Sequence, residues 1–263
     1  MNKNMADIQN SQDYREMRLD KVGVKGIKYP IWVDDRKHHI QQTIANINMY
    51  VELPHHYRGT HMSRFIAILN HYQDKTIVNK LPELLAEMKT KLNADFAYIE
   101  IYFPYFIGKK APVSKKSSLM SYDCCFIAEL GKKFKLKISV AVPITALCPC
   151  SKEISKYGAH NQRGYVTVTF CYNEFVWIEE IIELVESQAS APVYALLKRE
   201  DEKFVTELAY DNPKFVEDVV RDVANLLDKD KRITEYKVES EHFESIHNHN
   251  VYAMVKKHRK RNA

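Results

Sequence analysis

Apolar positions in the first half of the chain recur at two different periods, which predicts one strand followed by two helices. Residues 41–53 alternate at a period of two, and Pro54 ends that run. Thr60 is a suitable cap for a helix that begins there, and a second helix is predicted over residues 76–92. The apolar stripes of the two helices are Phe65, Ile66, Ile68 and Leu69, and then Leu81, Leu84, Leu85 and Met88.

The middle of the chain returns to a period of two. Residues 96–103 and 119–130 are predicted strands, and a turn at 131–132 leads into a third strand over 134–143. Residues 1–30, in contrast, are polar and irregular, which predicts a loose N-terminal arm.

The second half nearly repeats this order of elements. A strand is predicted over residues 165–172 and an amphipathic helix over 176–187. Asn212 and Pro213 are a capping residue and a first-turn proline, so they open a further helix with one strongly apolar face. The last two predicted strands are 233–239 and 251–256.

Strands followed by helix pairs, twice in one chain, predict a tandem α+β layer fold. We expect an N-terminal arm over residues 1–33, a first module over 34–130, a second module over 131–257 and a basic tail over 258–263.

Composition narrows the class of protein and of ligand. Of 263 residues, 45% are hydrophobic and 28% charged, which is typical of a globular chain. The 7 glycines lack the spacing of both common glycine-rich phosphate loops, so a bound nucleotide would rely on side chains and other backbone donors. The net charge of +5 is mild, and the terminal basic run indicates a solvated tail, with a nonspecific anionic partner as the alternative. Nucleic acid is not an expected partner.

The sequence also carries no sign of a membrane span or a secretion signal. No apolar run approaches the roughly 18 residues that a spanning helix needs, and residues 1–17 lack an apolar signal core. We expect a soluble, cytoplasmic protein without membrane contact. The 5 cysteines are odd in number and indicate no disulfide framework, and Cys124, Cys125 and Cys171 are expected to be reduced residues of the core or half-buried at its edge.

The segment Leu147–Arg163, LCPCSKEISKYGAHNQR, holds the densest candidate chemistry. It follows a strand and leads into a short helix, and it places Cys148, Cys150 and His160 near one another. A thiolate and an imidazole are good ligands for Zn²⁺ or Fe²⁺, but the spacing matches no zinc finger, so an open site with remote ligands fits better. The alternative is a pair of buried turn thiols beside a histidine that bonds backbone.

A second candidate is the segment HFESIHNHN, residues 242–250. In an extended chain His247 and His249 would point to one side and Glu244 to the other, although a loop would relax that arrangement. Such a histidine pair recurs at metal sites, and it is also a common polar decoration of turns.

Two carboxylates and a basic helix start complete the candidates. Glu202 lies in a charged turn, REDEK, and offers a hard oxygen ligand; Glu217 lies near the positive start of a helix. Arg58, His61 and Arg64 at another helix start suit a phosphate. Each residue also fits an ordinary surface role. Together they indicate metal-assisted hydrolysis of a phosphorylated heterocycle.

Three of these motifs, LCPCSKEISKYGAHNQR, RGTHMSRF and FESIHNHN, resemble the signature segments of the type IB GTP cyclohydrolases. The resemblance extends from about Gln41 to Val255. It implies tandem tunnelling-fold modules, with antiparallel sheets backed by helix pairs, assembled into a homotetramer with sites at subunit interfaces. It also implies hydrolytic opening of the guanine imidazole ring of GTP to 7,8-dihydroneopterin triphosphate and formate, the first step of folate and pterin biosynthesis.

The resemblance further implies roles for individual residues. One divalent metal, Mn²⁺ or Fe²⁺ with Zn²⁺ as a third choice, would be held by Cys148, His160, Glu202 and His247. Cys148 and Glu244 are the expected catalytic groups, and Glu217 would anchor guanine. Arg58, His61 and Arg64 are the expected contacts of the triphosphate.

Two other functions stay open from the sequence. The first is another pterin or deazapurine enzyme of the same fold. The second is a non-enzymatic protein with a closed structural metal, since structural zinc sites fill all four coordination positions.

Overall fold

The computed structural model describes residues 8–9, 11–72 and 76–258. The first residues of the expected arm and residues 259–263 of the expected basic tail lie outside this part of the chain. The chain divides into two compact units, Met1–Phe103 with Cys125–Lys137, and Pro104–Cys124 with Ile138–Ala263.

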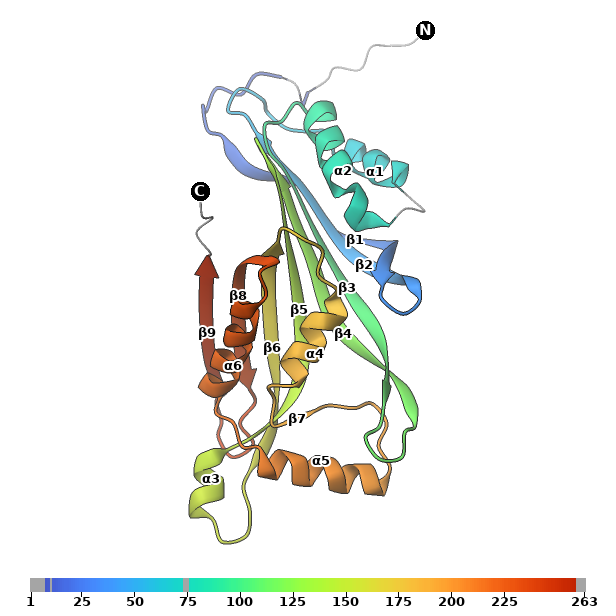
Figure 1. The fold of residues 1–263 in the computed structure, drawn as a ribbon. Coiled ribbons are helices and arrows are strands. Elements are labelled where there is room, and N and C mark those ends of the chain that lie inside the picture. The colour runs from blue at the N-terminus through green and yellow to red at the C-terminus, as the bar shows by residue number, and fades with distance from the viewer. Residues whose placement is uncertain (1–7, 10, 73–75, 259–263) are drawn as a thin grey trace. The chain divides into compact units, whose positions relative to one another are not determined.

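The elements are strands and helices, and most of them are in the order that the sequence predicts (Figure 1). The first unit contains β1 (Leu19–Asp35), β2 (His39–Leu53), α1 (Met62–His71) and α2 (Ile77–Lys91). Three long strands contribute residues to both units: β3 (Ala97–Lys110), β4 (Ser117–Leu130) and β5 (Phe134–Leu147). The second unit adds α3 (Pro149–Ile154), β6 (Asn161–Tyr172), α4 (Ile178–Glu186), β7 (Ala191–Pro192), α5 (Arg199–Asp211), α6 (Val216–Lys229), β8 (Ile233–His242) and β9 (Val251–His258).

The predicted loose arm is wrong from Leu19 onward, because β1 begins there and pairs antiparallel with β2. Only its last third alternates with buried residues, among them Ile31 and Val33, so the pattern before them resembles an irregular segment. The strand is also interrupted: its register with β2 shifts before Ile27, where Gly26 has a φ of 74°. An irregular edge strand leaves little periodic signal in a sequence.

The helices of the first unit match the predictions with two small differences. The helix predicted to begin at Thr60 begins at Met62 with His61 as its cap, and Ile66, which was expected in the apolar stripe, is 39% exposed. The predicted stripe of α2 is confirmed in full. Both helices pack against β1 and against each other.

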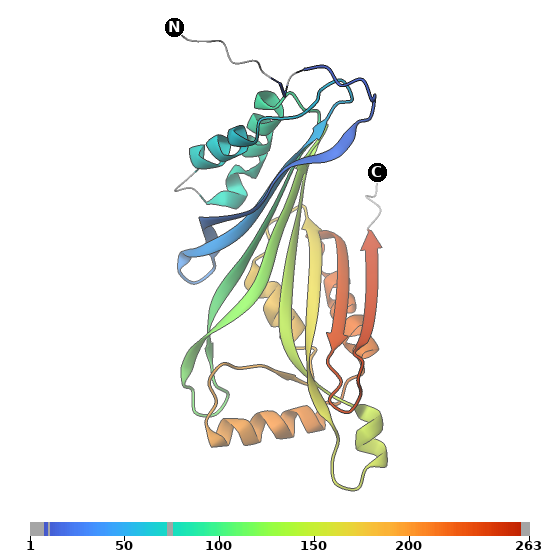
Figure 2. The same ribbon diagram turned by 180° about the vertical axis from the view of Figure 1, so that it is seen from behind.

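In the second unit, the strands pair antiparallel in the order β5-β6-β8-β9, and the short β7 pairs with β5. Helix α6 packs against β8 and β9, and α4 contacts α6. Figures 1 and 2 show both helices on the same face of these strands. The expected pairing of a sheet with two helices is therefore confirmed here, and it leaves the strand ends free to carry loops.

Two local predictions in the second unit are wrong for the same reason. The charged turn predicted at residues 199–203 is the first turn of α5, and α6 begins at Val216 rather than at Asn212. Asn212 instead ends α5, where its N–H binds the Leu208 carbonyl, and Asp218 accepts the N–H of Phe215 to cap α6. A strongly polar short helix gives a weak period, and its end can be mistaken for the start of the next.

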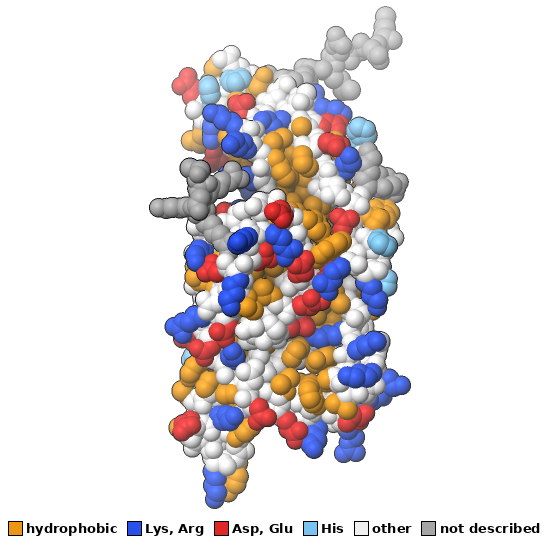
Figure 3. Space-filling model, viewed as in Figure 1, with side chains coloured by type: hydrophobic (Ala, Val, Ile, Leu, Met, Phe, Trp, Pro, Cys, Tyr) orange, Lys and Arg blue, Asp and Glu red, His pale blue; other side chains and the backbone are white. Residues whose placement is uncertain are grey.

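The observed fold is α+β and antiparallel, as predicted. The two compact units divide inside the long strands, while the module boundaries at residues 34–130 and 131–257 stay a prediction. Among the described helices, none combines the length and the apolarity that crossing a membrane requires. On the face seen in Figure 3, charges of both signs are interspersed with apolar side chains, in keeping with the small net charge.

Candidate active site

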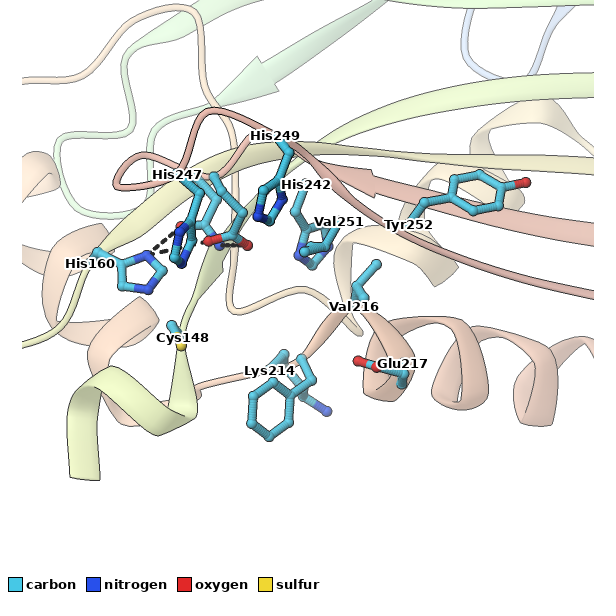
Figure 4. Close-up of a pocket in the computed structure, with 13 residues that line it drawn as sticks. Cys148, His160, Lys214, Val216, Glu217, His242, His247, His249, Val251 and Tyr252 are labelled. Atoms are coloured by element: carbon cyan, nitrogen blue, oxygen red, sulfur yellow. Dashed lines mark hydrogen bonds and ion pairs between the residues drawn. The ribbon is translucent and has the colours of Figure 1, made fainter. Parts of the chain in front are cut away.

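A pocket of about 450 Å³ lies in the second unit, where several strand ends and one helix start meet (Figure 4). The residues that line it come from the end of β5, the start of β6, the start of α6, and the segment that joins β8 to β9. They are Cys148, His160, Gln162, Lys214, Phe215, Val216, Glu217, His242, Glu244, His247, His249, Val251 and Tyr252.

Cys148 occupies the junction between β5 and α3. It is the residue before Pro149, and its Sγ accepts the N–H of Ser151 at 3.4 Å. Its own N–H binds the His160 carbonyl at 3.2 Å, and the His160 N–H binds Ser151 Oγ at 3.2 Å. The loop that contains Cys148 is thereby closed on His160, so the predicted thiol and imidazole reach the same pocket.

His160, Gln162 and Glu244 form a chain of polar contacts at the pocket wall. His160 Nδ1 lies 2.9 Å from Gln162 Oε1, and Gln162 Nε2 donates to Glu244 Oε1 at 3.1 Å. Glu244 Oε2 lies 3.7 Å from His160 Nδ1. Since the amide oxygen and the carboxylate are acceptors, Nδ1 carries the proton in this arrangement, and Nε2 of a neutral ring keeps a free lone pair. His160 is thus prepared to bind a cation or to accept a proton.

Residues 243–250 form an irregular loop, which bears on one expectation. Of the two arrangements that the sequence leaves open, an extended chain and a loop, the structure has the loop, and Glu244, His247 and His249 all line the pocket. The rings of His247 and His249 stack with centroids 5.1 Å apart and planes at 11°. Both rings belong to exposed residues, so they can adjust when a ligand enters.

His242, the last residue of β8, is the most buried titratable group of the pocket at 2% exposure. Burial lowers its pKa to about 4, against the opposing effect of the Glu217 carboxylate. Its Nε2 is buried and has no hydrogen-bond partner among the described residues. The ring is therefore neutral at ordinary pH.

The start of α6 brings Glu217 and Lys214 to the pocket. The N–H of Lys214 binds the Leu147 carbonyl at 3.1 Å, which holds this segment against the end of β5. Lys214 Nζ pairs with Asp222 Oδ2 at 2.5 Å. Glu217 lies in the first turn of α6 and is exposed, so its carboxylate is accessible from the pocket.

The remaining predicted residues lie elsewhere. Glu202 is exposed on α5 and does not belong to the pocket-lining residues of the described chain. The basic cluster lies in the first unit, where His61 caps α1 and Arg64 Nη1 donates to the Lys91 carbonyl at 2.9 Å; Arg58 is exposed nearby in sequence. A phosphate-binding role for these three side chains stays a prediction.

The pocket residues fit a transition metal in chemistry, although the predicted set is incomplete. Within the described part of the chain, no three His, Cys, Asp or Glu side chains are arranged to hold a cation. Yet Cys148, His160 and His247 line one pocket, and a thiolate with two imidazoles suits Zn²⁺ or Fe²⁺. The hydrogen-bonded Nδ1 of His160 is also the usual arrangement of a metal-binding histidine. One chain thus offers three of the four predicted ligands.

Sequence reasoning selected neither Gln162 nor Lys214 and gave no role to His242, although all three line the pocket; His249 was part of the predicted histidine pair and lines it too. For Gln162 a signal existed, because it lies two residues after His160 at the beginning of a strand and so shares its side. For His242 the signal was absent, since only the pairing of β8 with β6 places it at the site.

The fold is shared with proteins of very different sequence. A uricase from Bacillus fastidious matches with a TM-score of 0.57 at 10% identity, covering 94% of this chain and 94% of that one. A uricase from Arthrobacter globiformis matches with a TM-score of 0.53 at 8% identity, covering 92% and 94%. These likenesses concern the fold alone, which is the tunnelling fold, as the motifs predict.

Sequence comparison reaches further. The family described as "Type I GTP cyclohydrolase folE2" matches residues 5–253. GTP cyclohydrolase FolE2 of Geotalea uraniireducens (strain Rf4) is 56% identical over 253 residues, which is 96% of this chain and 93% of the relative. GTP cyclohydrolase FolE2 of Geobacter sulfurreducens is 54% identical over 257 residues, covering 98% of this chain and 100% of the relative. The chain therefore belongs to the type I GTP cyclohydrolase folE2 family.

Proposed function

We propose that this chain hydrolyses GTP to 7,8-dihydroneopterin triphosphate and formate, the first step of folate and pterin biosynthesis. The observation that carries the proposal is the pocket itself. It joins a thiol, a histidine with a defined proton position and an accessible carboxylate, in a chain that matches FolE2 proteins over nearly its whole length.

Glu217 is the proposed anchor of the guanine base. A carboxylate accepts the N1–H and the exocyclic N–H of guanine together, and adenine does not offer that pair of donors. Its position in the first turn of α6 suits this role, because the positive end of the helix dipole interacts favourably with a negative charge.

Glu244 is proposed to move protons during ring opening, while Gln162 and Glu244 hold the His160 ring for the metal. With Nδ1 fixed by Gln162 and Glu244, His160 Nε2 is the atom that would bind the metal, and the Glu244 carboxylate is the group that accepts or returns a proton. Cys148 supplies a second group for proton transfer, since its half-buried thiol lines the same pocket.

A divalent metal is the proposed cofactor, held by Cys148, His160 and His247, with Glu202 as the fourth ligand. When bound, it supplies Lewis acidity that makes water nucleophilic near neutral pH. Mn²⁺ or Fe²⁺ is the proposed ion, and Zn²⁺ also suits this donor set.

Because Glu202 lies outside the pocket of its own chain, we propose that another copy provides it, in a homotetramer whose sites lie at subunit interfaces. The basic residues Arg58, His61 and Arg64 would then hold the triphosphate. Mixing an inactive Cys148→Ser variant with an inactive Glu202→Gln variant tests this, since exchange of subunits restores some complete sites only if the two residues come from different copies. Mixtures that stay inactive, with subunit exchange verified by mass, contradict the shared site.

The activity itself is tested on chelator-treated protein to which Mn²⁺, Fe²⁺ or Zn²⁺ is returned under reducing conditions. Formate and, after oxidation, pterin fluorescence are measured with GTP as substrate. Both products together support the proposal. A folded, metal-loaded protein that forms neither product contradicts it.

The anchoring role has a test of its own. Glu217→Gln keeps the shape of the side chain and removes the charge, so binding of GTP should weaken roughly 10- to 100-fold, as loss of a charge-assisted contact predicts. The metal content should stay that of the parent protein. Unchanged affinity for GTP would refute the role of Glu217.

A further inference from the structure

His242 has a feature that the proposed mechanism does not use. Its side chain is 2% exposed, and its Nε2 is buried with no hydrogen-bond partner in the described part of the chain. The same residue lines the pocket, across from the start of α6 (Figure 4). A buried nitrogen without a partner is costly, and the cost is removed when a ligand in the pocket supplies the missing hydrogen bond.

The fold holds this ring in place by pairing it with a glycine. Gly164 on β6 lies directly opposite His242 on β8. A Cβ at position 164 would lie 2.6 Å from Cδ2 and 3.3 Å from Nε2 of His242. The imidazole therefore occupies the space of a missing side chain, which fixes its orientation without a hydrogen bond.

The charges around His242 favour one part of a nucleotide over another. Burial keeps the ring neutral, and the Glu217 carboxylate is the charged group that acts on it. A neutral ring near a carboxylate suits an uncharged heterocycle, whereas phosphate groups need cations. Lys214 lies three residues before Glu217 and also lines the pocket, but its ammonium group is paired with the Asp222 carboxylate.

We propose that His242 Nε2 hydrogen-bonds the heterocyclic base of the substrate. The part of the pocket between His242 and Glu217 then takes the base, and the phosphates lie elsewhere. This inference rests on the proposed function, in which the substrate is GTP, and adds a second base contact to that of Glu217.

The test compares His242→Phe, which keeps a buried ring, with His242→Gln, whose amide can replace Nε2 as donor or acceptor. Ser240→Ala is the matched control, because Ser240 lies two residues earlier on β8, is also fully buried, and also has an unpartnered oxygen, but does not belong to the described pocket lining. KM is measured for GTP, and inhibition constants are measured for guanosine and GMP against GTP turnover.

We expect His242→Phe to weaken the binding of guanosine, GMP and GTP by the same factor. The factor should be roughly 3- to 10-fold, which corresponds to the loss of one hydrogen bond. His242→Gln should recover part of the loss, and Ser240→Ala should change nothing. The melting temperature of His242→Phe should not fall, because the variant removes a buried polar atom that lacks a partner.

Three results would overturn the inference while the proposed function stands. The first is that KM and the inhibition constants are unchanged in His242→Phe, and the second is that only the binding of GTP is weakened. The third is that weaker binding in His242→Phe comes with a lower melting temperature and that His242→Gln does not recover the binding. A parent protein that does not turn over GTP contradicts the proposed function itself, and the inference fails with it.

Discussion

Asp201 and His242 are two buried polar side chains of the same unit, and they are opposite in one respect. Asp201 is 0% exposed and accepts hydrogen bonds from the N–H groups of Val113, Ser114 and Lys198 and from the Ser114 hydroxyl. His242 is equally buried, but its Nε2 has no partner among the described residues. A buried group whose hydrogen bonds are complete stabilises the fold, whereas an unpartnered buried nitrogen on a residue that lines a pocket is suited to a ligand.

The difference has a consequence for what each neighbourhood can do. The bonds of Asp201 fix the first turn of α5 to the connection between β3 and β4, so this contact is structural. The pocket, in contrast, has polar atoms that can still bind a ligand. They are His160 Nε2, His242 Nε2 and the exposed carboxylate of Glu217. Three substitutions and the pH dependence of stability can distinguish the structural contacts of Asp201 from the ligand-binding groups of the pocket.

The largest effect is expected on stability, from Asp201→Ala. Three backbone N–H groups and one hydroxyl lose their acceptor, so the melting temperature should fall by far more than in Asp218→Ala. Asp218 is a matched control because it caps α6 through one N–H, that of Phe215, and such a cap contributes about 1 kcal/mol. Thermal melts of the two variants check this, and similar losses would show that the network around Asp201 is not cooperative.

The next effect is expected on activity, from Gln162→Leu. This change removes the contact that fixes His160 Nδ1 and frees Glu244, so turnover should fall roughly 10- to 100-fold, as for other changes behind a functional histidine. The melting temperature should move little. Thr169→Val is the control, since it removes a hydroxyl bond on the same strand outside the pocket, and an equal loss of turnover in both variants would contradict the role of Gln162.

A smaller effect is expected from Gly164→Ala. The added methyl group would lie 2.6 Å from His242 and 3.0 Å from the Glu241 carbonyl, so the ring must move, at a cost of about 1–3 kcal/mol. Both stability and affinity for guanosine should drop. Gly108→Ala provides the control, because nothing lies within 4 Å of its added Cβ. Equal behaviour of the two variants would mean that Gly164 does not position His242.

The pH dependence of stability gives the smallest effect and the clearest sign. Burial raises the pKa of Asp201, but the bonds from Ser114, Lys198 and Val113 outweigh it and hold that pKa well below its usual range. Its contribution is therefore present above about pH 3.9, the pKa of an unfolded Asp, and is lost as the pH falls below that value.

For His242 the pH range over which stability changes lies higher. Its folded pKa of about 4 is below the ordinary value of 6.5, so the unfolded chain gains a proton first and stability falls between those two values. Melts of the parent and of His242→Phe from pH 8 to 4 should diverge across this window. Parallel curves would show that His242 is not the neutral, buried group that the structure describes.

Much of the fold was predictable because its signal is local. The stripe of α2 and the existence of β2 follow from neighbouring residues, and both were confirmed, although Ile44, which was counted in the alternation of β2, is 67% exposed. The start of β1 and the whole of α5 were missed, since a bulged edge strand and a polar helix carry little periodicity. Their formation depends on partners far away in sequence, such as Val113 and Ser114 for the first turn of α5.

The candidate site divides in the same way. The residue types of Cys148, His160, His247 and Glu217, within motifs that resemble one family, were enough to predict the chemistry and the class of substrate. Which residues share a pocket was beyond the sequence: the structure gathers those four with Glu244, and leaves Glu202 on α5.

By itself, then, the sequence determined the α+β order of elements and the side chains available for catalysis, because periodicity and residue chemistry are properties of short segments. Only the tertiary structure decided that Glu244 joins Gln162 and His160, and that the missing side chain of Gly164 leaves room for the His242 ring. Both depend on strand register, which brings together residues far apart in the chain, and register is set by the packing of the whole sheet.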